Sequence, residues 1–260
     1  MIFAPKLIAL DVDGTIVDGL NDMSPAVREA VRAAAEAGIH IVISTGRSMP
    51  GVMNAVEKIG LSDGLAVASN GAVVFSFRPP TVLHAITFDA SEAVQLVLEQ
   101  VPDAMVAVEE LGVGYRVNKP FPDGEINGQM KLESVLELIA QPVTRVIIRA
   151  PEHSPESFSK MVHSLGLEGT NYFIGYTAWL DLAPEGVSKA SGLDLVCAEL
   201  GVAAADVLAI GDGLNDLEMI TWAGRGVAMG QAPDELKDLA DGITASIHED
   251  GAAQEIRSYL

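Results

Sequence analysis

Two aspartates separated by one residue, Asp11 and Asp13, follow directly after the apolar run from Leu7 to Leu10. Side chains two positions apart lie on the same face of an extended chain, so these two carboxylates would repel each other. A protein tolerates such a pair when a cation lies between the carboxylates, when they share a proton, or when water solvates both in a turn. Because Asp13 and Gly14 also form a common turn sequence, the pair by itself leaves these explanations open.

Two more polar segments occupy equivalent places in the sequence. STGR, from Ser44 to Arg47, follows the apolar run IHIVI, and GDGLND, from Gly211 to Asp216, follows DVLAI. In open α/β sheets, ligands bind in the crevice outside the carboxyl ends of the parallel strands. We therefore expect the three segments to converge on one site, although any one of them alone would fit an ordinary loop.

The elements that must position these segments alternate between strands and helices. The helix expected from Ser24 has a capping serine, a proline at its first position and a glycine, Gly38, at its end. The same alternation returns after Val187, which predicts an α/β fold with a Rossmann-like core and a parallel sheet. The expected helices of this core are 24–38, 49–60, 188–201 and 214–224.

The segment between Thr87 and Pro184 has a different composition, because it is rich in proline and glycine from Asn118 onward. Its patterns predict an α+β insert with strands of its own. The expected helices are 91–100, 132–139 and 155–165, and the expected strands are 104–109, 114–118 and 143–150, with a hairpin over 172–182. At 260 residues, the chain is long enough for one large domain or two unequal ones.

The composition argues against several classes of partner. Acidic residues outnumber basic ones by 36 to 16, and the formal net charge of −20 would repel nucleic acids and anionic membranes. A small anionic substrate would need a pocket that concentrates cations locally. The sequence has no apolar stretch of about 18 residues, and its single cysteine, Cys197, lies in an apolar run, so we expect a cytoplasmic protein with a buried structural thiol.

Four segments together resemble the signature of the haloacid dehalogenase (HAD) superfamily. Asp11 and Asp13 resemble its DxDxT motif, Thr45 its Ser/Thr motif, Lys189 in GVSKASGL its lysine motif, and GDGLND its acidic motif. All four occur in the order that the superfamily has. The resemblance covers nearly the whole chain.

The insert lies between the second and third motifs, where Cof-like phosphatases carry a type IIB (C2B) cap. NGA at Asn70 and the C-terminal segment from Gly226 resemble the same branch, in which an asparagine usually stands where this chain has Gln231. The resemblance implies a HAD-like core of residues 1–85 and 187–260, and a cap of residues 86–186 that sets substrate specificity.

The resemblance also implies a mechanism. Asp11 would attack phosphorus and form an aspartyl-phosphate, and Asp13 would protonate the leaving group and then accept a proton from the hydrolytic water. Mg²⁺ would be held by Asp11, Asp212 and the backbone carbonyl of Asp13, because this small cation prefers oxygen ligands. Without such a cation, a nucleophilic carboxylate could not approach an anionic phosphate.

The remaining motif residues would bind the phosphoryl group. Thr45 would supply a hydroxyl, Gly46 a backbone N–H and Lys189 a fixed positive charge. Asp216 would orient Lys189 or metal-bound water, with Asn215 nearby. A lone lysine at the start of a helix is more often a solvated surface cation, and only the accompanying motifs reverse that expectation here.

Several other residues have two readings of similar weight. Arg47 either contacts phosphate or substrate, or caps a helix or pairs with a surface acid. Asn70 either contacts substrate or forms a simple turn with Gly71. In the insert, residues that could face a substrate have core or surface roles as their ordinary explanation: Tyr115, Arg116, Lys119 and Trp179.

The function expected from these observations is Mg²⁺-dependent hydrolysis of a small phosphomonoester, a sugar phosphate or a phosphoglycolate-like acid. A phosphomutase, or a dedicated sucrose- or mannosyl-type phosphatase, is the alternative within the same chemistry. A metabolite-binding protein on a retained scaffold is the alternative without catalysis, although such a protein would not need to keep Asp13. The sequence leaves open whether the chain is a monomer or a dimer.

Overall fold

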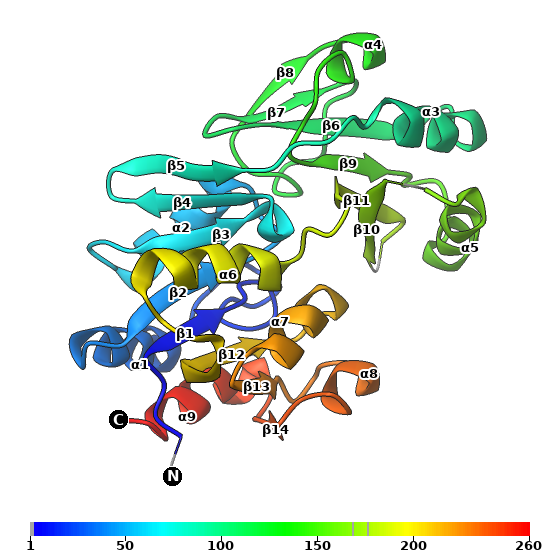
Figure 1. Ribbon diagram of the computed structural model, residues 1–260. Coiled ribbons are helices and arrows are strands. Elements are labelled where there is room, and N and C mark those ends of the chain that lie inside the picture. Colours follow the sequence, from blue (N-terminus) through cyan, green and yellow to red (C-terminus); the bar gives the residue numbers. More distant parts are fainter. Residues whose placement is uncertain (1–2, 168, 176) are drawn as a thin grey trace. The chain divides into compact units, whose positions relative to one another are not determined.

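The computed structural model describes residues 3–167, 169–175 and 177–260 and divides them into two compact units (Figure 1). The first, the core unit, comprises the chain up to Gly46 together with Val52–His84 and Ser188–Leu260. The second, the insert unit, comprises Arg47–Gly51 and Ala85–Val187. The boundaries expected from the sequence lie one residue from the breaks at 84/85 and 187/188, but the grouping of Arg47–Gly51 with the insert was not predicted.

The core unit is built on an eight-stranded sheet in the order β14-β13-β12-β1-β2-β3-β4-β5. The strands from β14 to β3 are parallel, and β4 runs antiparallel to β3. Their bounds are β1 Leu7–Leu10, β2 His40–Ser44, β3 Leu65–Ala68, β4 Val73–Phe77, β5 Pro80–Ala85, β12 Val207–Gly211, β13 Arg225–Ala228 and β14 Gly242–Ile243.

β1 lies inside this sheet because all four of its residues are apolar and fully buried. A strand that is covered on both faces has a continuous apolar sequence instead of an alternating one. Leu10, its last residue, pairs with Ile210 of β12 and with Ile43 of β2. These registers bring the polar segments after all three strands to one edge of the sheet.

The helices of the core unit follow from capping and apolar spacing. In α1, the Ser24 side chain accepts a hydrogen bond from the Val27 N–H over 3.1 Å, and the buried residues recur every three or four positions. The face of β1 that carries Leu7 and Ala9 packs against α6, α7 and α8, and α1 packs against β2 and α9 (Figure 1). The helix bounds are α1 Pro25–Glu36, α2 Met49–Ile59, α6 Lys189–Leu200, α7 Leu217–Trp222, α8 Asp234–Lys237 and α9 Gly251–Arg257.

The insert unit has its own sheet, in the order β10-β11-β9-β6-β7-β8. Its neighbouring strands are antiparallel except for the parallel pair β7 and β8. One face packs against α3 and α5, and the other carries Tyr115, Phe121, Ile147 and Trp179. The bounds are α3 Ser91–Gln100, β6 Met105–Glu110, β7 Gly114–Val117, β8 Gln129–Leu132, α4 Val135–Leu138, β9 Val146–Arg149, α5 Pro155–Leu165, β10 Thr170–Gly175 and β11 Trp179–Pro184.

The predicted α/β core with its parallel sheet is confirmed, and the predicted helices 91–100 and 155–165 have the observed bounds. The helix predicted over 132–139 is wrong in its first half. Leu132 ends β8, and α4 begins only after Ser134, whose side chain accepts the Glu137 N–H while the Glu137 carboxylate accepts the Ser134 N–H. Within the described residues, the structure has no helix of the length and apolarity that a membrane crossing requires.

Candidate active site

The polar segments that follow β1 and β12 lie side by side. The Asp11 N–H donates to the Ile210 carbonyl over 3.0 Å, which continues the parallel pairing past the end of β1. Gly14, at φ +81°, lies directly against Asp212, since a Cβ atom at position 14 would be 2.1 Å from Asp212 Oδ2. The absence of a side chain at Gly14 therefore allows the Asp212 carboxylate to approach the loop that carries Asp11.

Lys189 joins two of the acidic side chains. It is the first residue of α6, which begins where Ser188 accepts the Ser191 N–H with its side chain. The Lys189 Nζ donates to Asp11 Oδ1 over 2.6 Å and to Asp216 Oδ1 over 2.5 Å. Its side chain is completely buried, which excludes the alternative that it is a solvated surface cation.

Asp216 holds the GDGLND loop in place. Its Oδ2 accepts the backbone N–H groups of Asp212 and Gly213, each over 2.9 Å, while its Oδ1 accepts from Lys189. Gly211 makes room for this carboxylate, because a Cβ atom there would lie 2.5 Å from it. Three donors thus fix Asp216, and through it both Lys189 and the backbone next to Asp212.

This group carries more negative than positive charge. Carboxylate oxygens of Asp11, Asp212 and Asp216 lie within 4.8 Å of one another. Burial, and next the charge of Asp216, raise the pKa of Asp11 well above its usual range even though Lys189 opposes them. The same two causes raise the pKa of Asp212 to about 6.

The ammonium of Lys189 remains protonated in these surroundings. Burial acts to lower its pKa, but the carboxylates of Asp11 and Asp216 outweigh burial and raise it. One ammonium does not balance three carboxylates, so the donor set fits a divalent cation bound by hard oxygen ligands.

The Thr45 and GDGLND segments meet through Asn70. The Asn70 N–H donates to the Thr45 carbonyl over 3.1 Å, and its side-chain Oδ1 accepts from Asn215 Nδ2 over 3.0 Å. Gly46 lies against the same amide, since a Cβ atom there would be 3.0 Å from Asn70 Oδ1. Asn70 is almost fully buried, so it is an internal bridge between these loops and more than a turn residue.

The backbone at this bridge is left-handed over three consecutive residues, with φ values of +53° at Ser69, +53° at Asn70 and +106° at Gly71. A Cβ atom at Gly71 would lie 1.9 Å from the carbonyl oxygen of Ser188, the residue before Lys189. Glycine is therefore needed at position 71 for both its conformation and its contact with the start of α6. The NG dipeptide, which also fits an ordinary turn, thus contacts the segments of three of the four motifs: those of Thr45, Lys189 and Asn215.

Comparison with known proteins identifies the family to which the chain belongs. Residues 8–256 match the model of the haloacid dehalogenase-like hydrolases. The chain belongs to this family. Pyridoxal phosphate phosphatase YbhA of Escherichia coli is 32% identical, with 98% of each chain covered, and the phosphoglycolate phosphatase of Methanothermobacter thermautotrophicus is 30% identical, with 98% of this chain and 99% of the relative covered.

A solved structure agrees with these relatives. The crystal structure of a haloacid dehalogenase-like hydrolase from Bacteroides thetaiotaomicron superposes with a TM-score of 0.83 at 26% identity, covering 98% of this chain and 100% of the other. Together, the family match and the related phosphatases identify the protein as a phosphoric monoester hydrolase of the Cof-like HAD branch. Enzymes of this superfamily use a metal ion, and the acidic group around Asp212 is where the HAD core could hold one.

Two predicted site residues are not themselves buried in this group, although the charge of Asp13 acts on both Asp11 and Asp212. Asp13 is exposed and forms a bridge with Val17, so its carboxylate is accessible to solvent. Arg47 belongs to the insert unit, and its side chain lies beside Gly51. Sequence reasoning also missed a contact inside the DxDxT loop, where the buried Thr15 hydroxyl donates to Asp11 Oδ2 over 3.3 Å.

The insert unit has a buried polar cluster of its own. Arg145 donates to both carboxylate oxygens of Asp181, over 2.5 and 2.9 Å, and to the Tyr115 hydroxyl over 2.7 Å. Trp179 Nε1 donates to the same Asp181 over 3.1 Å. Burial is the main cause that raises the pKa of Tyr115 to about 12. Tyr115 and Trp179 therefore have structural partners, in line with the ordinary explanation for them.

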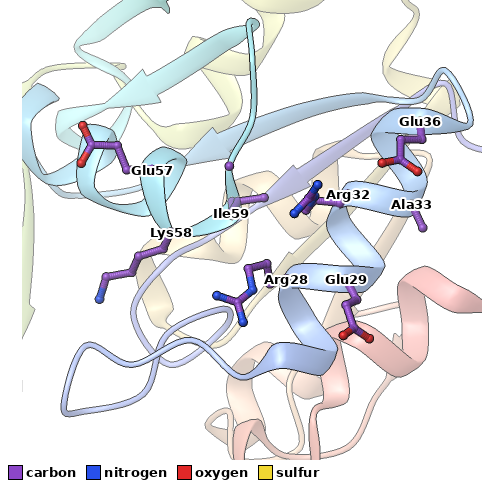
Figure 2. Close-up of a pocket in the computed structure, with 9 residues that line it drawn as sticks. Arg28, Glu29, Arg32, Ala33, Glu36, Glu57, Lys58 and Ile59 are labelled. Carbon is purple, nitrogen blue, oxygen red and sulfur yellow. The ribbon is translucent and has the colours of Figure 1, made fainter.

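A separate hollow of about 610 Å³ lies on the core unit between α1 and the end of α2 (Figure 2). Figure 2 shows that charged side chains of both signs line it: Arg28, Glu29, Arg32, Glu36, Glu57 and Lys58. None of the described motif residues lines this hollow. Three basic and three acidic groups give it no preference for an anion. It does not compete with the motif loops as the active site.

Proposed function

We propose that this phosphatase hydrolyses a small phosphorylated metabolite with the help of Mg²⁺, through an aspartyl-phosphate on Asp11. The observation that carries the proposal is the buried arrangement in which Lys189 donates to both Asp11 and Asp216, with Asp212 alongside. An ion pair so deeply buried is costly to build, and such clusters concentrate at functional sites.

In this proposal, Asp11 is the nucleophile. An oxygen of its carboxylate attacks phosphorus in line, the bond between phosphorus and the ester oxygen breaks, and Asp13 gives its proton to the departing alkoxide. In the second half, water loses a proton to Asp13 and attacks phosphorus, and the bond from Asp11 to phosphorus breaks. Free phosphate leaves, and Asp11 and Asp13 return to their starting states.

The phosphoryl oxygens are held by groups around this carboxylate. Thr45 offers its hydroxyl, Gly46 its backbone N–H, and Lys189 its ammonium, which the two aspartates already orient. Asn215, fixed by Asn70, lies next to these loops and offers a further polar contact. Arg47 follows Gly46 directly and is a candidate contact for substrate.

The proposed Mg²⁺ ligands are the carboxylates of Asp11 and Asp212 and the backbone carbonyl of Asp13. When bound, the ion offsets the charge of the nucleophile and of the phosphate. Asp216 is a supporting residue in this scheme because its two oxygens are already held by Lys189 and by two backbone N–H groups.

The proposed substrate is a phosphomonoester of a small organic molecule, since the two named relatives are phosphatases of pyridoxal phosphate and of phosphoglycolate. The insert unit, as a C2B-type cap over residues 86–186, would set which leaving group is accepted. Fold and motifs determine the reaction, whereas specificity depends on side chains outside them.

A screen of phosphorylated metabolites tests the proposal. Purified protein with Mg²⁺ should release inorganic phosphate from at least one metabolite and from a generic aryl phosphate, and excess EDTA should abolish both reactions. Undiminished turnover in EDTA would refute the role of the metal. Conversion of the metabolite with no loss of organic phosphate would identify a mutase instead.

A further inference from the structure

Gln231 follows β13 and reaches across the edge of the core sheet. Its Nε2 donates to the Gly14 carbonyl over 2.6 Å and to Asp212 Oδ2 over 3.3 Å, and its Oε1 accepts the Ile247 N–H over 3.0 Å. One exposed side chain thus contacts the loop after β1, the loop after β12 and the turn after β14. With its own position after β13, it connects the carboxyl ends of four neighbouring strands.

The backbone around Gln231 is fixed closely enough to aim its amide. The Met229 N–H donates to the Gly211 carbonyl over 2.9 Å, and the Gly230 N–H donates to the Ala245 carbonyl over 3.1 Å. At Gly230, a Cβ atom would lie 2.7 Å from the Ser246 nitrogen, so the chain passes here without room for a side chain. Gln231 therefore projects from a segment that is tied on both sides to the loops it joins.

We infer that Gln231 is a positioning residue that holds the Asp212 carboxylate in the orientation needed to bind the metal ion. The inference rests on the proposed function, because it assumes that Asp212 is a metal ligand. Asp212 Oδ2 is held from two sides, by the Gln231 amide and by contact with Gly14, which leaves Oδ1 as the less constrained oxygen. Groups that orient a ligand in this way commonly change metal affinity when they are removed.

The amide hydrogens of Gln231 are already used within the protein, so the side chain is not a hydrogen-bond donor to substrate. Both hydrogens of Nε2 point to acceptors, Gly14 and Asp212, and Oε1 already has a donor in Ile247. An asparagine at position 231 would withdraw the amide by one methylene from Gly14, Asp212 and Ile247. The glutamine is thus matched to a bridge between loops, and the sequence departure at this position has a structural reason.

Binding of Mg²⁺ to metal-stripped full-length protein tests the inference. Gln231→Met keeps the length of the side chain and removes all three hydrogen bonds. The matched control is Gln254→Met. The side chain of Gln254 is exposed, and its one described hydrogen bond goes to the Glu249 carbonyl. Calorimetric titration should show a Kd for Mg²⁺ about tenfold higher in Gln231→Met. Gln254→Met should stay within about twofold of the unmodified protein.

Activity gives a second readout. In Gln231→Met, the Mg²⁺ concentration for half-maximal hydrolysis of an aryl phosphate should rise by a similar factor, while kcat at saturating Mg²⁺ changes little. A merely structural role would instead lower kcat or Tm with no change in metal affinity. If Gln231→Met does not fold in EDTA, Gln231→Asn replaces it, with the same expected rise in Kd because its amide is one methylene shorter.

The outcomes separate the two proposals. A folded variant that binds Mg²⁺ as tightly as the unmodified protein overturns the positioning role of Gln231. Failure of the unmodified protein itself to bind Mg²⁺ overturns the proposed function. Asp212→Asn calibrates the assay, since loss of the ligand itself should weaken binding at least as much as loss of Gln231.

Discussion

The buried cations of the core unit and of the insert unit differ in how many carboxylates they hydrogen-bond. In the insert, Arg145 gives two hydrogen bonds to one carboxylate, that of Asp181, and a third to Tyr115, while Trp179 also donates to Asp181. In the core, Lys189 is shared by Asp11 and Asp216, and Asp212 adds a further carboxylate. A cation that bonds one carboxylate is typical of a structural ion pair, whereas a cation shared by two carboxylates with a third beside it is suited to an additional ion or ligand.

The same contrast appears in how the chain builds each cluster. The core group comes from loops at the ends of separate parallel strands and from the first turn of α6, all brought together by the register of β1 with β2 and β12. The insert cluster comes from side chains on or beside strands β7, β9 and β11 of one sheet, in which β9 adjoins β11 and β6 lies between β9 and β7. Loop-borne groups at strand ends are accessible to a ligand, while strand-borne groups pack between elements.

The largest difference between the two regions should appear when one aspartate in each is replaced. Asp11→Asn keeps the shape of the side chain but removes the nucleophile, and kcat for an aryl phosphate should fall by at least about 10⁴-fold. Asp103→Asn, at an exposed site of the insert next to Lys119, should leave kcat within about twofold. Activity near that of the unmodified protein in Asp11→Asn, with contamination excluded, would show that another group is the nucleophile.

Removing the insert should abolish substrate specificity while hydrolysis itself continues. Replacement of residues 89–184 with a short Gly/Ser linker should leave slow hydrolysis of aryl phosphates, because Asp11, Lys189 and Asp212 all belong to the core unit. The value of kcat/KM for the best metabolite should fall by about 10²-fold relative to that for the aryl phosphate. If a folded linker variant kept the original ratio, specificity would have to reside in the core.

Breaking the insert cluster should affect stability more than chemistry. Arg145→Met leaves the largely buried Asp181 without its cation, and the free energy of unfolding of the insert should fall by about 3 kcal/mol. Arg149→Met, which removes a more exposed pair with Glu125, should cost about 1 kcal/mol or less.

The two tryptophans provide the measurement. Trp179 lies in the insert unit and Trp222 in the core unit. Denaturant unfolding followed by fluorescence in a Trp222→Phe background therefore reports the insert, and a Trp179→Phe background reports the core. Equal losses in both backgrounds would mean that the two units unfold as one, contrary to the division proposed here.

The smallest expected effect concerns Cys197, which lies buried in α6. Burial, and next the charge of Asp194, raise the pKa of its thiol from the usual 9.0 to about 11. A thiol reagent at pH 8 should therefore react slowly with native protein and rapidly after unfolding. Because the folded pKa is the higher one, the contribution of Cys197 to stability is full below pH 9 and decreases as pH rises toward 11. Cys197→Ala should reduce that slope, and prompt labelling of native protein would contradict the buried position.

Much of this arrangement was predictable because the relevant signals are local. An apolar run followed by Asp11, or a capping serine before Lys189, is visible in a few consecutive residues. The start of α4 was missed because Leu132 has an apolar side chain that suits both a strand and a helix, and the reciprocal bonds of Ser134 and Glu137 decide between them. The bridge made by Asn70 and the reach of Gln231 depend on residues more than 15 positions apart, which no local pattern encodes.

The left-handed turn at Ser69, Asn70 and Gly71 has a practical consequence for anyone who wishes to redirect this enzyme. Libraries aimed at a new leaving group would do well to leave these three positions unchanged, because the turn touches the Thr45 loop, Asn215 and the start of α6 at once. A side chain at position 71 would displace Ser188 and with it the lysine that follows. On the proposal that the insert sets specificity, diversity belongs in its strands and loops, where a poor choice should lower selectivity and leave the hydrolytic chemistry available for the next round.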